Sequence, residues 1–267
     1  MHEPVQVVVG VLAALFIGVS KAGFGGGLGM VTTPLCVLAF GPRDAIGILL
    51  PLLCVGDLFS LYHYWGLWER KNLGYLLPGV VVGVVVGVQL IGRFSARELN
   101  LAIGLLAISF VAFQLGKDFI FRVEGAFAPN HWVGVPCGVC AGITSTFAHG
   151  AAPLVSMFLI PQRLPKVRYV GTTILVFTWV NWVKLPLYCL DRHVFDWSWV
   201  PTEAIINRHT LFTSAPLLPV VPVGVWIGVW LNRKFSETGF VRVIYVLTFL
   251  AGLELVGNFN LARFLGR

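Results

Sequence analysis

Apolar residues fill this chain in long runs, and charged residues gather in short clusters between those runs. A helix needs about 20 mostly apolar residues to cross a hydrocarbon core about 30 Å thick. The pattern therefore predicts eight transmembrane segments, at residues 5–40, 45–67, 73–92, 99–116, 132–160, 170–190, 211–231 and 241–257. The first and fifth are too long for one crossing and contain polar or glycine-rich interruptions. The predicted fold class is an all-α polytopic membrane protein.

Composition excludes several other classes. Of the 267 residues, 57% are hydrophobic and only 12% are Asp, Glu, Lys or Arg, whereas soluble domains carry about 25% charged residues. A soluble enzyme with one buried core, a disordered chain and a nucleic-acid-binding module are therefore excluded. The net charge of +7 fits the excess of Lys and Arg that orients membrane proteins. Residues 1–4 lack the basic start of a signal peptide, so we expect the first apolar segment to remain in the mature fold.

Matches at constant offsets indicate an internal repeat. At an offset of 141 residues, Pro78, Gly83 and Gly87 match Pro219, Gly224 and Gly228; at an offset of 124, Gly47, Asp57, Leu61 and Tyr64 face Gly171, Asn181, Leu185 and Tyr188. Gly-x-x-x-Gly spacing alone is also explained by close helix packing. We predict a first repeat at residues 1–116, a connecting segment at 117–131 and a second repeat at 132–267. Many secondary transporters are built from such repeats, with their sites near the midplane.

Each predicted repeat begins with an interrupted segment. In the first, the glycines Gly25, Gly26, Gly27 and Gly29 disfavour continuous helix, because glycine costs about 1 kcal/mol relative to alanine there. In the second, we predict the interruption over residues 142–150. Irregular backbone at membrane depth must be buried in protein or line a wet cavity. Backbone N–H groups at the start of the next half-helix would attract anions there.

The hydroxyls of Thr144, Ser145 and Thr146 lie in the second predicted interruption, together with the imidazole of His149. Hydroxyl and imidazole groups suit the oxygens of an oxyanion, and histidine can change its charge near neutral pH. The hydroxyls can instead cap the next half-helix, near Pro153. Both interpretations stay open, as does the choice between full crossings and re-entrant hairpins, which would invert the repeats.

Several segments in both halves of the chain resemble a known family. The segments that carry the resemblance are residues 18–29 with Pro34-Leu35, and in the second half Ala141-Gly142, residues 144–149, Pro153, Gln162-Arg163, residues 171–173 and residues 181–186. Together they resemble the TauE/SafE family of sulfite and organosulfonate exporters. The resemblance implies about eight spans in two repeats and transport of sulfur-containing anions across the cytoplasmic membrane. It implies a class of solute, not one solute, and export is favoured by this analogy alone.

Few formal charges fall within the predicted spans, namely those of Lys21, Asp57, Lys184 and Glu254. A charge at a helix centre costs about 2.5–3.5 kcal/mol on insertion scales. Lys21 and Lys184 either bind the anion or extend to an interface, and Asn181 shares a helical face with Lys184. Asp57 neutralises a lysine of the empty site, binds a coupling H⁺ or Na⁺, or forms a structural salt bridge. For Glu254 we favour an interfacial position.

The predicted anion site therefore comprises Lys21, Gly25, Gly26, Gly27, Thr144, Ser145, Thr146, His149, Asn181 and Lys184, with Asp57 as the coupling or charge-balancing residue. The expected partners are a small sulfur oxyanion or sulfonate, the lipid bilayer, a coupling H⁺ or Na⁺ and, in one hypothesis, a second copy in a homodimer. No nucleic acid, metal or cofactor is expected.

Two other functions fit the same residues. An anion channel could use one site with both gates open. A membrane-embedded sulfur-trafficking subunit would use Cys137 and Cys140, although their CxxC spacing lacks a second pair or an adjacent acidic cluster. No Walker loop, zincin helix or nucleophile elbow occurs, so we expect neither an enzyme nor an ATP-driven pump.

Overall fold

The computed structural model describes residues 3–21, 29–120, 128–191, 203–234 and 237–257, and the regular elements within them are helices. In chain order they are α1 (Glu3–Lys21), α2 (Gly29–Phe40), α3 (Pro42–His63), α4 (Arg70–Arg93), α5 (Ala96–Ile120), α6 (His131–Ala148), α7 (Ala152–Leu159), η1 (Ile160–Gln162), α8 (Lys166–Tyr188), α9 (Arg208–Ser214), η2 (Ala215–Leu217), α10 (Val220–Lys234) and α11 (Glu237–Gly257). The predicted all-α class is confirmed.

Among the described helices, α1, α3, α4, α5 and α8 are each long and apolar enough to cross a bilayer. The pair α9 and α10 is bent by 46° and counts as a sixth span if it crosses as one unit. Helices α2 and α7 and the part of α11 from Tyr245 to Gly257 are shorter apolar helices. The chain is therefore a multi-pass membrane protein, and the count of eight spans stays a prediction.

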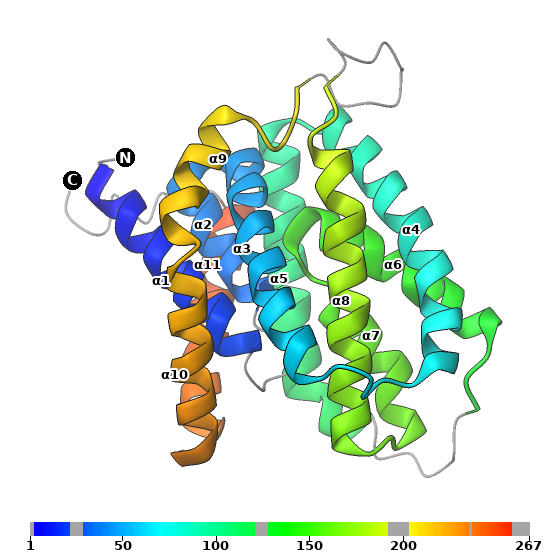
Figure 1. The fold of residues 1–267 in the computed structure, drawn as a ribbon. Helices are drawn as coiled ribbons and strands as arrows, with labels where there is room; N and C mark the ends of the chain where they lie inside the picture. The colour runs from blue at the N-terminus through cyan, green and yellow to red at the C-terminus, as the bar shows by residue number, and fades with distance from the viewer. Residues whose placement is uncertain (1–2, 22–28, 121–127, 192–202, 235–236, 258–267) are drawn as a thin grey trace.

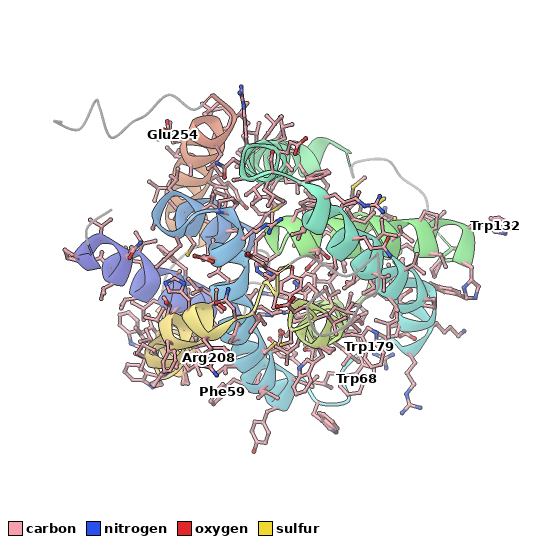
Figure 2. The ribbon with its side chains drawn as sticks, turned by 90° about the horizontal axis from the view of Figure 1, so that it is seen from above. Phe59, Trp68, Trp132, Trp179, Arg208 and Glu254 are labelled. Carbon is pink, nitrogen blue, oxygen red and sulfur yellow. The ribbon has the colours of Figure 1, made fainter. Side chains whose placement is uncertain are left out.

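Aromatic and aliphatic side chains cover the outside of the bundle. Trp132 is 90% exposed and Trp226 is 72% exposed. Figure 2 shows Trp132, Phe59 and Trp179 around the periphery, seen from above. Buried apolar surface stabilises a protein in water by about 25 cal/mol per Å², so this exterior is unfavourable in water and favourable in lipid. Glu254 is half-buried and lies at the periphery of the bundle in this view, and its expected place at a membrane interface stays a prediction.

Helices from the two halves of the chain are interleaved. Helices α3 and α8 pack against each other in the middle of the bundle, α1 packs along α10 on one flank, and α4 packs along α6 on the other (Figure 1). Helix α5 packs along α11 behind them. Each of these four contacts joins a helix of the first half to a helix of the second.

Glycines permit the two flanking contacts. A Cβ atom added to Gly83 of α4 would lie 2.1 Å from the carbonyl oxygen of Val139 in α6. One added to Gly18 of α1 would lie 2.3 Å from the carbonyl oxygen of Val221 in α10. No real side chain fits at such distances, so the backbones meet directly, as small residues allow in membrane helices. The packing interpretation of these glycines is thereby supported.

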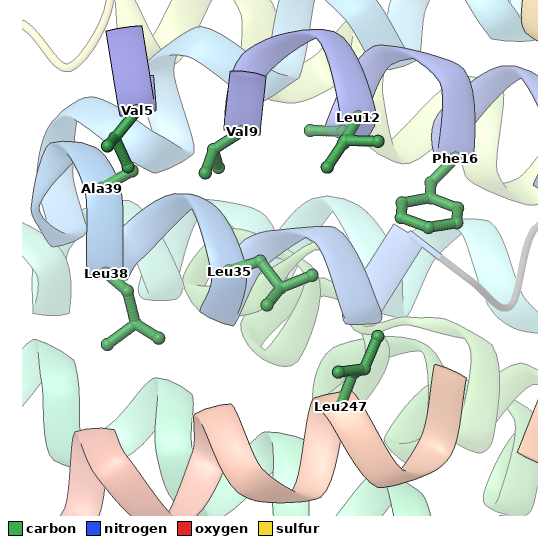
Figure 3. A pocket seen from close by; sticks show the side chains of 9 residues that line it. Val5, Val9, Leu12, Phe16, Leu35, Leu38, Ala39 and Leu247 are labelled. Carbon is green, nitrogen blue, oxygen red and sulfur yellow. The ribbon is translucent and has the colours of Figure 1, made fainter. Parts of the chain in front are cut away.

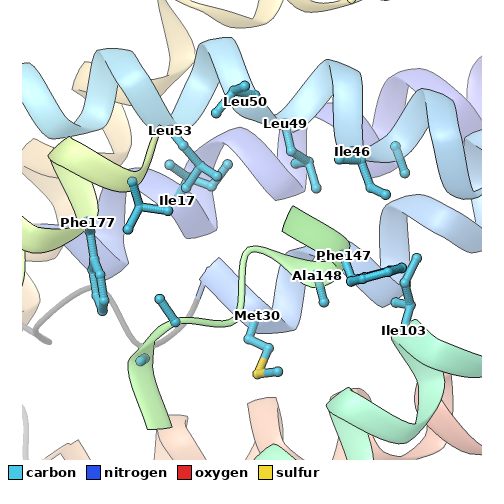
Figure 4. Packing of buried hydrophobic residues seen from close by; sticks show 14 of the residues in the cluster. Ile17, Met30, Ile46, Leu49, Leu50, Leu53, Ile103, Phe147, Ala148 and Phe177 are labelled. Atoms are coloured by element: carbon cyan, nitrogen blue, oxygen red, sulfur yellow. The ribbon is translucent and has the colours of Figure 1, made fainter. Parts of the chain in front are cut away.

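The second interruption, the turn between α6 and α7, lies inside the protein. Buried apolar residues of α3, including Ile46, Leu49 and Leu53, pack beside the start of α2 and the turn between α6 and α7 (Figure 4). Across this region, the Thr33 hydroxyl of α2 donates a hydrogen bond of 2.9 Å to the carbonyl oxygen of Ala148. Protein therefore surrounds the irregular backbone of this turn, as membrane depth requires.

The second interruption is shorter than predicted. Helix α6 continues to Ala148, so only residues 149–151 separate it from α7, and the prediction of non-helical backbone over 142–148 is wrong. The Thr146 hydroxyl bonds at 2.7 Å to the carbonyl oxygen of Gly142, one turn earlier, and leaves the helical ladder intact. The helix ends at His149, whose left-handed φ of 51° closes the last turn. In the first interruption, Gly25, Gly26 and Gly27 lie outside the described residues.

The packing of α4 on α6 yields a prediction. Gly83→Ala forces a methyl group against the Val139 backbone, and such overpacking costs about 1–3 kcal/mol. We expect a lower midpoint of thermal unfolding in detergent, measured by tryptophan fluorescence. Gly74, on the same helix, has no atom within 4 Å of its added Cβ, so Gly74→Ala should leave the midpoint unchanged or raise it. Equal losses in both variants would contradict the packing account.

Candidate functional site

The inward faces of α3 and α8 carry the polar residues of the site. Leu53, Asp57 and Ser60 follow one another at helical spacing on α3, and Phe177, Asn181 and Lys184 do so at the same spacing on α8. Asp57 and Lys184 are fully buried, and Asn181 is 4% exposed. Because the two helices pack together, these side chains meet in the middle of the bundle.

Asp57 joins the end of α1 to α8. The Lys21 ammonium pairs with Asp57 Oδ1, and Asn181 Nδ2 donates to Asp57 Oδ2 at 2.7 Å. Lys21 is buried and its Nζ lies 5.7 Å from the centre of the Phe177 ring, a favourable cation–π distance. The Ser60 hydroxyl donates to the backbone carbonyl of Lys21 at 3.0 Å and fixes the end of α1. Lys21 therefore does not extend to an interface.

Uncharged hydrogen-bond acceptors surround the Lys184 ammonium. Its ammonium lies 3.1 Å from the carbonyl oxygen of Ser145, 3.0 Å from the Ser145 hydroxyl and 2.9 Å from His149 Nδ1. His149 Nε2 lies 3.3 Å from the carbonyl oxygen of Ile46. Since a carbonyl only accepts, the geometry assigns the proton to Nε2 and leaves Nδ1 to accept from Lys184. No carboxylate of the described residues lies within ion-pair distance of Lys184.

Both lysines stabilise the C-terminal ends of interrupted helices. Lys21 is the last residue of α1, and Lys184 binds a carbonyl in the last turn of α6. A further carbonyl of that turn, from Thr146, accepts a 2.7 Å hydrogen bond from the Tyr188 hydroxyl. Cations are favourable at helix C-termini, where the dipole is negative. At Lys21, the helix end in place is therefore the C-terminus of its own helix, α1, which does not attract an anion.

A small cavity of about 20 Å³ lies between the end of α1, the turn between α6 and α7, and the helices α3 and α8. Its lining residues are Lys21, Leu53, Ser145, His149, Ala151, Phe177 and Asn181. This volume accommodates about one water molecule. Of the predicted site residues, Lys21, Ser145, His149 and Asn181 line it, whereas Asp57 and Lys184 contact the lining residues from behind.

Two further predicted residues, Thr144 and Thr146, lie away from the cavity lining. Thr144 and Thr146 do not line the cavity, because their hydroxyls bond to backbone carbonyls, for Thr144 those of Cys140 at 2.9 Å and Gly150 at 3.1 Å. They do not cap α7 either, since its N-cap residue is Ala151, without a side-chain hydrogen bond. The capping interpretation is therefore wrong.

Sequence reasoning missed three lining residues, Leu53, Ala151 and Phe177. Two of them carried a signal. Phe177 precedes Asn181 by four residues, and Leu53 precedes Asp57 by four, so each lies one helical turn away on the same face. Ala151 had no such signal, because the exact extent of the interruption determines its position.

Two larger cavities do not suit an anion. One, of about 330 Å³, lies between α1, α2 and α11, and its lining is apolar: Val5, Val9, Leu12, Ala13, Phe16, Leu35, Leu38, Ala39 and Leu247 (Figure 3). Another, of about 490 Å³, lies between α5 and α11 and is lined by Tyr245 and aliphatic and phenylalanine side chains. An oxyanion transferred there would lose its hydrogen bonds to water. Both surfaces suit the acyl chains of lipids.

No grouping in the described residues could hold a metal ion. Cys137 is half-buried and Cys140 is exposed, both on α6, and neither lines the small cavity. The CxxC pair is therefore separate from the buried polar cluster.

The Lys21–Asp57 pair yields a prediction about stability. Removing one partner of a buried pair leaves an uncompensated charge and costs about 3–5 kcal/mol, whereas replacing both can be nearly neutral. We expect Lys21→Met and Asp57→Asn each to lower the thermal unfolding midpoint, and the double variant to recover most of the loss. Unfolding of the four proteins in detergent forms a double-mutant cycle. Additive losses would show that the pair contributes no mutual stabilisation.

Comparisons with known proteins agree with this architecture. The chain is 22% identical, over 269 residues, to the "Probable membrane transporter protein YjnA" of Bacillus subtilis (strain 168), an alignment that covers 92% of this chain and 98% of that protein. No solved structure matches the chain. The model of the family described as "Sulfite exporter TauE/SafE" matches residues 10–255. This match covers most of the chain, and the protein therefore belongs to the TauE/SafE family of membrane transporters.

Proposed function

We propose that this protein is a secondary transporter that exports a small sulfur-containing anion, sulfite or an organosulfonate, across the cytoplasmic membrane. The observation that carries the proposal is the cluster of two buried lysines and one buried aspartate beside a cavity between two interrupted helices. Lys184 has no carboxylate partner among the described residues and leaves this cluster short of negative charge. A buried charge in a membrane protein is costly and indicates a functional site by default, a transport pathway being one of its common uses.

Two homologous repeats, residues 1–116 and 132–267 joined by residues 117–131, form the second part of the proposal. Asp57 and Asn181, which match at an offset of 124, bond directly to each other. Ser60 and Lys184, which match at the same offset, bind backbone carbonyls in the last turns of α1 and α6. A residue touches its own counterpart only near the axis that relates two repeats. The site would therefore lie on that axis, as in other repeat transporters.

The small size of the cavity supports alternating access. A sulfite ion has four heavy atoms, and a space for about one water molecule does not admit it. Polar contacts also link the two halves: Arg168 pairs with Glu69 at 2.9 Å, and Asn72 donates to Gln162 at 2.8 Å. Binding then requires helices to move, which suits a transporter better than an open channel. H⁺ or Na⁺ as the coupling ion, and a homodimer, stay predictions.

Flux measurements test the proposal. Wild-type protein in liposomes should carry labelled sulfite or methanesulfonate saturably and prefer either to chloride. The double variant Lys21→Met with Asp57→Asn removes the Lys21 cation without leaving a buried charge unpaired. Its anion flux should fall to the level of protein-free liposomes. Lys71→Met, which removes an exposed cation on α4, is the matched control and should keep the wild-type rate. Imposed H⁺ and Na⁺ gradients then identify the coupling ion.

Three outcomes would contradict the proposal. Absence of flux for every sulfur anion in a folded wild-type protein would remove the substrate class. Unsaturable conductance would replace the transporter with a channel. Wild-type flux in the double variant would place the anion site away from Lys21.

A further inference from the structure

The donors that face the cavity are already bound to an anion of the protein itself. Lys21 and Asn181 line the cavity, and each contacts a different oxygen of the Asp57 carboxylate. Asp57 is fully buried behind them. One donor comes from the end of α1 and the other from α8, so the carboxylate bridges an interrupted helix of one half and a continuous helix of the other.

A sulfonate or sulfite group can engage the same two donors. Two of its oxygens, joined through sulfur, present a forked edge comparable to the two oxygens joined through carbon in a carboxylate. Charged donors bind such edges about twice as strongly as neutral ones. Because the cavity holds about one water molecule, the anion cannot simply be added beside the existing contacts. It must take donors over from Asp57.

We propose that Asp57 is an internal competitor of the transported anion, occupying Lys21 and Asn181 when the carrier is empty and releasing them to substrate. This inference rests on the proposed transport function and adds a role for Asp57 that a structural salt bridge lacks. The empty carrier then contains no unpaired charge at Lys21, and it can return across the membrane closed. While Asp57 is displaced, the carrier can cross only if the substrate anion stays bound to Lys21.

Charge counting gives the substrate class. With both lysines protonated, Lys21, Lys184 and Asp57 carry a formal sum of one positive charge, because no carboxylate of the described residues pairs with Lys184. One monovalent anion brings the sum to zero, whereas a divalent anion overshoots it. A low-dielectric site favours the neutral sum. The site should therefore prefer a sulfonate or hydrogen sulfite to sulfate.

The test compares binding and transport in Asp57→Asn and wild type. With the competitor removed, methanesulfonate and sulfite should bind the purified variant tighter by about tenfold or more, since a charged donor loses a rival acceptor. The affinity for sulfate should rise more than the affinity for methanesulfonate, because the substitution raises the formal charge of the site by one. In liposomes the variant should keep exchange of external for internal anion and lose net efflux, because its empty form leaves Lys21 unpaired.

Matched variants separate this role from folding. Asp44→Asn makes the same change at a half-exposed position of the same helix, α3, and should alter neither affinity nor efflux. Asp57→Ser, whose short side chain leaves room for water beside Lys21, should reproduce the tighter binding and is measured if Asp57→Asn does not fold. Thermal unfolding with and without anion monitors the fold of each protein.

The outcomes distinguish the two proposals. If the wild-type protein binds the anions and both Asp57 variants bind them equally or more weakly, the competitor role is overturned. The transport function would then still stand. Equal loss of exchange and net efflux would also overturn the competitor role, since a structural role predicts that pattern. Absence of sulfite and methanesulfonate binding in all folded proteins would overturn the transport function, and the competitor role with it.

Discussion

A charge buried at membrane depth needs a counter-charge or a full set of hydrogen bonds, and the arrangement of this protein follows from that constraint at Lys21, Asp57 and Lys184. The Lys21–Asp57 pair satisfies one cation and one anion. Ser145 and His149 satisfy the other cation. Each of these partners reaches its place only because α1 and α6 end inside the bundle. The interruptions of the two helices and the buried charges therefore depend on each other.

The flanking helix contacts hold these ends in position. Glycines bring the backbones of α4 and α6, and of α1 and α10, into direct contact. Side chains on α3 and α8 then bind carbonyl oxygens in the last turns of α1 and α6. A membrane interior supplies no water to satisfy such carbonyls, so the polar groups of the site also have a structural task. The same groups bind the helix ends and face the cavity.

Sequence patterns predicted the class and much of the site. Long apolar runs predicted helices because lipid leaves few other solutions for the backbone. The cost of a buried charge directed attention to Lys21, Asp57 and Lys184, and the structure brings all three into one cluster. The extent of the second interruption was mispredicted, because the Thr144 and Thr146 hydroxyls bond to backbone carbonyls, several of them in their own helix, and let α6 continue. Ala151 and the pairing of α1 with α10 depend on long-range packing, which a local pattern does not contain.

An experimental structure with selenite bound would test the central claim most directly, because selenium scatters anomalously and selenite has the shape of sulfite. The account predicts an anomalous peak between the interruptions, within hydrogen-bond distance of Lys21 and Asn181, with the Asp57 carboxylate moved away from at least one of them. A peak at any other place in a transport-competent protein, or an undisturbed Lys21–Asp57–Asn181 chain beside bound selenite, would contradict it.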